Sequence, residues 1–148
     1  MRKLISLVLL LSLLLLSLAS CGEKEKITFG GNYYSDYDDE IYFDIVSVDY
    51  SGEYPRFNVR WFNNTALTVK YADWYTIECL IDGQWESCSL STSENGYSLY
   101  TLGSNSMGNI QYTTKNFDIS KPGSYRLRSF FSVDSTPSLR AWARFEVN

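Results

Sequence analysis

Few residue types in this chain could carry reaction chemistry. Its 148 residues include three cysteines, 17 acidic and 13 basic residues, and no histidine. Histidine is the commonest general base near neutral pH and the commonest metal ligand. No serine, lysine or cysteine stands beside a recognisable activating partner, and no spacing selects a carboxylate pair for glycoside hydrolysis. We therefore expect no catalytic residue, no metal and no cofactor.

The first cysteine follows a segment typical of protein export. Met1-Arg2-Lys3 is positively charged, and residues 4–18 are apolar except for three serines. A run of about 15 residues is shorter than a membrane-spanning helix and suits the apolar region of a signal peptide. Leu18-Ala19-Ser20-Cys21 resembles the bacterial lipobox, which implies acylation of Cys21 and cleavage before it. The alternative is an ordinary signal peptide, or an uncleaved anchor, that a cysteine happens to follow.

Lipid attachment would hold the chain on a membrane without a spanning segment. We expect residues 1–20 to be a cleaved signal peptide, residues 21–40 a lipidated polar tether, and residues 41–148 one domain. Two or three acyl chains hold a protein firmly on a bilayer, whereas a single chain binds only weakly. The expected location is the extracytoplasmic face of the cell membrane, where membrane lipid is the partner of acylated Cys21.

The charge of the exported part argues against one class of partner. Arg2 and Lys3 leave with the signal peptide, so 11 of the 13 basic residues remain beside 17 acidic ones. Binding to nucleic acid relies on a surplus of lysine and arginine that neutralises phosphates. We therefore expect no nucleic acid as a partner.

Apolar and polar residues alternate with a period of two through most of the expected domain. A change of parity at Ile45-Val46 predicts a β-bulge. Asp82-Gly83 lies between two β-rich arms in residues 77–88 and predicts a tight hairpin, because glycine supplies the positive φ of such turns. Eight or nine short strands, with no helical stripe, favour an antiparallel β-sandwich. The remaining strand candidates are residues 41–48, 56–61, 67–71, 97–102, 110–117, 124–133 and 138–147.

Three sequence motifs carry a family resemblance. They are Asn64-Thr65, the segment from Tyr75 through IECLIDGQW to Trp85, and KPGSYR at residues 121–126. Together they resemble bacterial immunoglobulin-like domains over Ile41 to Val147. The resemblance implies an immunoglobulin-like sandwich without catalytic residues. We also expect Tyr125 to form a tyrosine corner, with its hydroxyl bonded back to the backbone of the preceding turn.

Two cysteines remain once Cys21 is assigned to lipid. In the predicted hairpin Cys88 would face Ile77, with Cys79 diagonally adjacent on the same side of the sheet. Diagonal neighbours lie about 7–8 Å apart, so a disulfide would need a twist or a shift of register. Export favours oxidation, and the alternative is two free thiols packed in the core. Two thiols without histidine are too few ligands for a zinc site.

The last two predicted strands place arginines and aromatic residues on one side. If the strands pair as a hairpin, one exposed face carries Arg126, Arg128, Phe130, Arg140, Trp142 and Arg144. Arginine suits bidentate contacts with carboxylates or phosphates, and tryptophan stacks on a sugar or another ring. The alternative is that the arginines pair with Glu78 or Glu86 on adjacent strands, while their stems cover Trp142.

The densest acidic stretch is residues 36–40. It lacks the alternation and the central glycine of a dedicated calcium loop, so a solvated linker is the expected structure.

These observations favour a non-catalytic module that binds or scaffolds at the cell envelope. An anionic envelope polymer or another envelope protein would be its partner. An exported inhibitor or immunity-type protein, acting through residues 91–96 or 103–108, is the alternative, and a hydrolase with a carboxylate pair is the third hypothesis.

Overall fold

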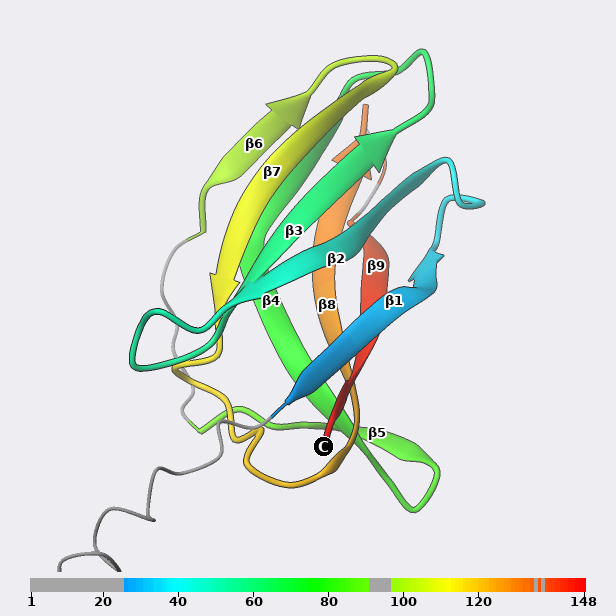
Figure 1. Cartoon of the computed structure of the whole chain (residues 1–148). Helices are drawn as coiled ribbons and strands as arrows, with labels where there is room; N and C mark the ends of the chain where they lie inside the picture. The colour runs from blue at the N-terminus through cyan, green and yellow to red at the C-terminus, as the bar shows by residue number, and fades with distance from the viewer. Residues whose placement is uncertain (1–25, 91–96, 135, 137) are drawn as a thin grey trace, which may run out of the picture.

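The computed structural model describes residues 26–90, 97–134, 136 and 138–148. Over these residues the chain forms nine strands in two antiparallel sheets that face one another (Figure 1). This confirms the predicted all-β fold. In the described part of the chain, no helix is long and apolar enough to cross a membrane. The predicted signal peptide and Cys21 lie outside the described residues.

The larger sheet, called sheet A here, has six strands. Their order is β1-β9-β8-β4-β5, and β6 pairs with the other half of β4 on the same edge as β5. Its strands are β1 (Ile27–Ser35), β4 (Val69–Ile81), β5 (Gln84–Ser87), β6 (Leu99–Leu102), β8 (Gly123–Val133) and β9 (Leu139–Val147).

The smaller sheet, sheet B, has three strands in the order β2-β3-β7. They are β2 (Ile41–Asp49), β3 (Arg56–Asn63) and β7 (Ser106–Thr113). The register between β2 and β3 shifts between Ile45 and Ser47, which confirms the bulge predicted from the change of parity. The bulge turns Val46 outward, where 43% of its surface is exposed.

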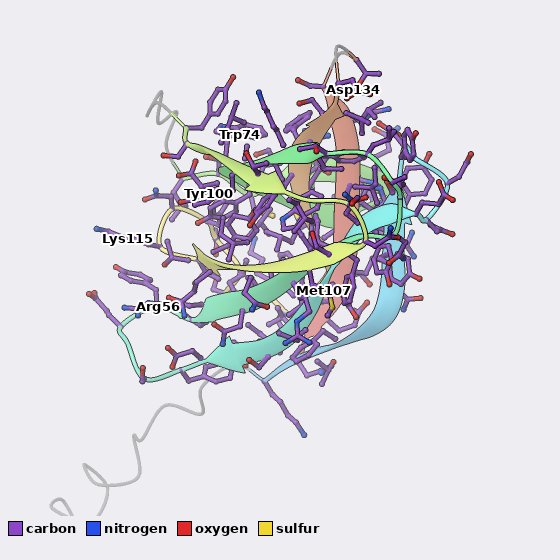
Figure 2. The ribbon with its side chains drawn as sticks, turned by 90° about the horizontal axis from the view of Figure 1, so that it is seen from above. Arg56, Trp74, Tyr100, Met107, Lys115 and Asp134 are labelled. Atoms are coloured by element: carbon purple, nitrogen blue, oxygen red, sulfur yellow. The ribbon has the colours of Figure 1, made fainter. Side chains whose placement is uncertain are left out.

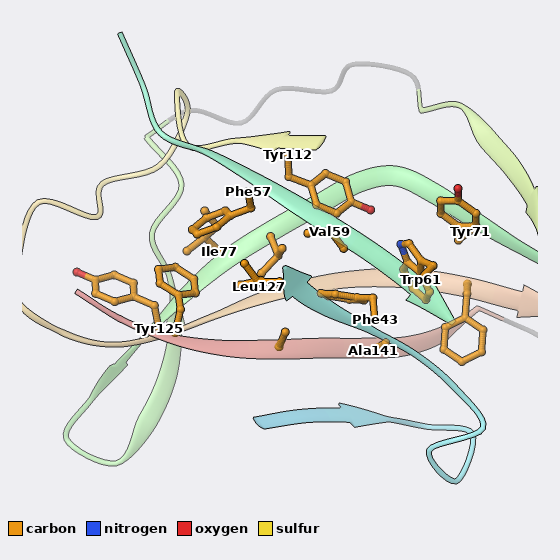
Figure 3. Close-up of a cluster of buried hydrophobic side chains, with 14 of the residues drawn as sticks. Phe43, Phe57, Val59, Trp61, Tyr71, Ile77, Tyr112, Tyr125, Leu127 and Ala141 are labelled. Atoms are coloured by element: carbon orange, nitrogen blue, oxygen red, sulfur yellow. The ribbon is translucent and has the colours of Figure 1, made fainter. Parts of the chain in front are cut away.

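Each sheet turns alternate side chains into one shared core (Figure 3). On β8, every second residue from Tyr125 to Val133 is buried. Trp61 of sheet B is fully buried, and its ring centroid lies 5.2 Å from that of Tyr71 and 5.8 Å from that of Phe131, both in sheet A. Full burial of one large apolar side chain stabilises a fold by roughly 1.5–3 kcal/mol, so these contacts hold the sheets together.

The hairpin at Asp82-Gly83 forms as predicted. Ile81 pairs with Gln84, which leaves a two-residue turn in which φ is 50° at Asp82 and 81° at Gly83. Positive φ at both central positions matches the right-handed twist of the flanking strands.

Two predicted boundaries were wrong. Residues 27–35 were assigned to the tether, but they form β1, which pairs with β9, so the folded domain begins before Ile41. The register of β1 shifts between Phe29 and Tyr33, around Gly30-Gly31, and this break hides the alternation of a strand.

The second error concerns β4, which is one strand of 13 residues where the sequence predicts two. A register shift between Tyr71 and Tyr75 explains why its two halves looked separate.

The tyrosine corner is present at the start of β8. The Tyr125 hydroxyl donates a hydrogen bond of 2.7 Å to the Lys121 carbonyl oxygen. The ring itself is buried and stacks on Phe145, with centroids 5.4 Å apart. The bond therefore connects the β7–β8 loop to the beginning of β8, a central strand of sheet A.

We expect Tyr125→Phe to lower the free energy of unfolding by about 1 kcal/mol, because it removes one intramolecular hydrogen bond and keeps the ring. Thermal unfolding of Tyr125→Phe should show a midpoint a few degrees lower. Tyr97→Phe is the matched control, since its side chain is 62% exposed. Equal midpoints for the two variants would contradict a structural role for the corner.

Candidate binding face

The structure brings the six predicted face residues together on the outer side of sheet A. β8 and β9 pair directly, and the register sets Arg126 opposite Arg144, Arg128 opposite Trp142, and Phe130 opposite Arg140. Their neighbours along each strand are buried in the core, so the alternation decides which side chains face outward. We call these six residues, with Tyr34, Glu78 and Trp85 described below, the arginine–aromatic face.

Aromatic rings and guanidinium groups form successive layers across this face. Tyr34 on β1 stacks on Trp142, with centroids 5.3 Å apart and ring planes 18° apart. The guanidinium carbons of Arg126 and Arg144 lie 5.6 Å and 5.3 Å from the centre of the Trp142 ring. They also lie 4.6 Å and 5.4 Å from the centre of the Trp85 ring on β5. The two arginines therefore lie between two tryptophan rings.

This layering decides what Trp142 can contact. β1 and β8 flank β9 on opposite sides, so Tyr34 and Arg126 approach the indole from opposite directions. Both faces of the Trp142 ring are thus occupied, and a sugar could stack on it only by displacing a neighbour. The alternative prediction, that arginines cover this ring, therefore agrees with the structure better than the prediction that a ligand stacks on it. The parts of Arg126 and Arg144 that lie near the ring are their guanidinium groups.

One buried carboxylate serves two of the arginines. Glu78 on β4 accepts a hydrogen bond from Nε of Arg126 at one oxygen, and its other oxygen lies 2.9 Å from a terminal nitrogen of Arg128. The Glu78 side chain is only 8% exposed. The predicted pairing with Glu78 is present, whereas no ion pair of the described residues involves Glu86.

Arg140 bonds to Asp36 at the β1–β2 connection. Its backbone nitrogen and its Nε each donate to the same Asp36 oxygen at 2.9 Å. Burial opposes ionisation of Asp36, but the hydrogen bonds and positive charge of Arg140 outweigh it and lower the pKa of this carboxyl. The stretch 36–40 is thus a turn with positive φ at Asp38 and Asp39, and Asp36 bonds it to β9. The prediction of a linker is wrong, although residues 38–40 are exposed to solvent as expected.

Arg144 differs from the other three. Its side chain is exposed like that of Arg140, but it is the one arginine of the face that makes no ion pair among the described residues. It lies directly across the strands from Arg126, and like charges in that position repel one another. The tryptophans on either side offset this repulsion, because the face of an aromatic ring attracts a cation. The carboxylate of Glu78 thus pairs with Arg126 and Arg128, and Arg144 is a third guanidinium group beside them without an ion pair.

The sequence did not point to Tyr34 or Trp85. Tyr34 falls in the segment predicted to be a tether, so the sequence gives no reason to place it on a sheet. Trp85 lies in the second arm of the predicted hairpin, and the register Leu80 opposite Trp85 places it on the same side as Glu78. The hairpin register, combined with the pairing of Glu78 and Arg126 between β4 and β8, is enough to place Trp85 on the arginine–aromatic face.

The cysteines lie away from this face. The backbone nitrogen of Cys88 donates to the Ile77 carbonyl at 2.9 Å, so Cys88 stands opposite Ile77 as predicted. Both Cys79 and Cys88 are free thiols in the structure. Burial, together with the adjacent Cys79 thiol, raises the pKa of Cys88, which disfavours the thiolate that acts as nucleophile or metal ligand. A disulfide stays a prediction for the exported, oxidised protein.

One of the two loops considered for an inhibitor can be placed. Of residues 103–108, the first three form the short β6–β7 connection and the last three begin β7, and the side chain of Asn63 donates to the Gly103 carbonyl at 2.7 Å. The Asn105 nitrogen also donates to the Thr65 carbonyl at 2.9 Å, so this loop is bonded to the β3–β4 connection. Residues 91–96 lie outside the described residues.

No protein-family model matches the chain, and no curated protein is significantly similar to it in sequence. The geometry and charge of the arginine–aromatic face are therefore the observations that bear on function.

We expect Glu78→Gln to lower the free energy of unfolding by about 2–3 kcal/mol, because it leaves two partly buried guanidinium groups without their counter-charge. Chemical denaturation measures this loss. Glu86→Gln is the control, since Glu86 is exposed and stands on the neighbouring strand. A Glu78→Gln variant as stable as Glu86→Gln would show that the shared ion pair does not hold the face together.

Proposed function

We propose that this chain is a lipid-anchored extracytoplasmic protein whose non-catalytic, immunoglobulin-like domain binds an anionic partner at the cell envelope. The single observation that carries the binding proposal is Arg144. It is an exposed guanidinium without an ion pair in the described structure, and it stands opposite Arg126, which shares the Glu78 carboxylate with Arg128. Such a cluster of arginines attracts carboxylate or phosphate groups, with which the guanidinium group forms paired hydrogen bonds.

Strand order supports the immunoglobulin-like type. The order β2-β3-β7 in one sheet corresponds to strands A, B and E of such domains, and β9-β8-β4 in the other corresponds to G, F and C. Tyr125 then falls near the start of strand F, where the tyrosine corner of these domains lies. β1 is an additional strand on the edge formed by β9.

The rigidity of the face supports binding over catalysis. Its charged groups are fixed by stacking and ion pairs, and they are spread over a sheet surface. A surface of this kind displays charge to a large partner. The tether and lipid at Cys21, proposed from the lipobox, would keep that surface close to the membrane on its extracytoplasmic side.

The anchor is tested by fractionation of cells that express the full chain. We expect the wild-type chain to remain with membranes in high salt and to be released by detergent, because acyl chains bind through apolar burial. In cells grown with radiolabelled palmitate, the wild-type chain should carry the label and Cys21→Ser should not, whether or not the apolar residues 4–18 are cleaved from the variant. Equal labelling of the two chains would contradict lipid anchoring at this cysteine.

The binding face is tested in the mature chain, residues 21–148 carrying Cys21→Ser, mixed with isolated envelope fractions. We expect Arg144→Gln to reduce retention several-fold at low salt, and the remaining binding to fall as salt rises. Because Arg144 opposes Arg126, its removal should leave the melting temperature unchanged or slightly higher.

Arg60→Gln is the matched control for this experiment. It removes the same charge from the outer side of sheet B, where Arg60 donates to the Asn109 side chain at 3.1 Å. Equal retention of the two variants would show that sheet A carries no specific binding face.

A further inference from the structure

A groove lies on the same outer side of sheet A, beyond the end of the arginine–aromatic face. It has a volume of about 560 Å³ and is open to solvent. β4, β8, the start of β6 with the chain before it, and the β8–β9 connection line it, and its lining includes Trp74, Tyr97, Leu99 and Phe130. Figure 2 shows Trp74 on the opposite side of the molecule from Arg56 of sheet B.

The aromatic rings of this groove are more accessible than Trp142. Trp74 is 38% exposed, and its ring contact within the described structure is with Phe130, at 4.9 Å and an angle of 45°. Tyr97 is 62% exposed. These two side chains thus offer ring surface to a ligand in the groove. On the arginine–aromatic face, Trp142 is already covered on both faces, and the exposed ring is Tyr34 at the edge, with 47% of its surface accessible.

The polar groups of the groove are hydroxyls and one cation. Ser132, Thr136 and Ser138 line it, and Lys70 is the one charged residue among its lining residues. A ligand that matches this lining has an apolar ring face, several hydroxyl groups and a negative charge. A sugar that bears an acid group has all three features.

The edges of β4 argue against a peptide in this groove. At Lys70, β4 is paired with β6 on one edge and with β8 on the other. A peptide could therefore not bind over this part of the groove by adding a strand to β4. An acyl chain would also remain partly in water in so open a groove, which forfeits the burial that drives its binding.

Phe130 connects the groove to the charged face. It lines the groove and stands opposite Arg140, and the guanidinium carbon of Arg128 lies 5.8 Å from the centre of its ring. A polymer can therefore contact the groove and the arginines along one continuous surface.

We propose that this groove binds a sugar ring of an acidic polysaccharide whose other acid groups contact the Arg126–Arg144 pair. The inference rests on the proposed function, and it names the class of anionic partner. Trp74 and Tyr97 contact the sugar ring, Lys70 contacts its acid group, and the arginine cluster supplies attraction that does not depend on the sugar.

The test uses two pairs of polymers that have the same acid group with and without sugar rings. They are polygalacturonate with polyglutamate, and dextran sulfate with polyvinyl sulfate. Binding to the mature chain carrying Cys21→Ser is measured by calorimetry. We expect the polysaccharide to bind more tightly in at least one pair. Trp74→Ala and Tyr97→Ala should each weaken that binding about 3- to 10-fold, the range of a lost aromatic contact, and leave binding of its sugar-free counterpart unchanged.

Further variants separate this inference from the proposed function. Arg144→Gln should weaken binding of all the polymers bound by the wild-type chain. Met107→Ala changes an exposed side chain of sheet B and should leave binding of every polymer unchanged. If Tyr97→Ala and Trp74→Ala bind the preferred polysaccharide as well as the wild type does, the groove proposal is wrong while an Arg144 effect still supports the charged face. Tyr97→Ala alone decides if Trp74→Ala fails to fold. Absence of binding to all four polymers would overturn both proposals.

Discussion

The register between β8 and β9 is the constraint on which both the core and the candidate site depend. With Leu127 opposite Ala143, alternate residues of the two strands enter the core, and the residues between them form the arginine–aromatic face. A shift of one residue in either strand would bury its arginines and expose its core residues. Burial of charged groups without partners is so costly that the sequence of these strands permits only this arrangement.

The face places positive charges close together, an arrangement that is unfavourable for two strands without other contacts. Arg126 and Arg144 are direct neighbours across the strands, and their repulsion is offset by Glu78 on one side and by the rings of Trp85 and Trp142. The same contacts hold the guanidinium groups in place before any ligand arrives. A ligand with negative groups would then lose less conformational entropy on the protein side when it binds.

The groove and the charged face differ in the chemistry they present. On the face, Trp142 is enclosed between Tyr34 and the guanidinium groups, so that its ring supports the arginines. In the groove, Trp74 and Tyr97 are accessible and only Lys70 is charged. The two surfaces therefore divide recognition between attraction of charge and contact with a ring, and Phe130 lies in both.

The sequence by itself determined the all-β class, the bulge at Ile45, the Asp82-Gly83 turn and the outward position of six face residues, because each depends on local alternation or backbone preference. It did not reveal β1, whose alternation Gly30-Gly31 interrupts, or the continuity of β4 across its register shift. Only the tertiary structure decided that Tyr34 and Trp85 join the face, that Glu78 serves two arginines, and that Arg144 remains without an acid partner among the described residues. These are contacts between strands distant in the sequence, and periodicity within one strand carries no information about which strand lies beside it.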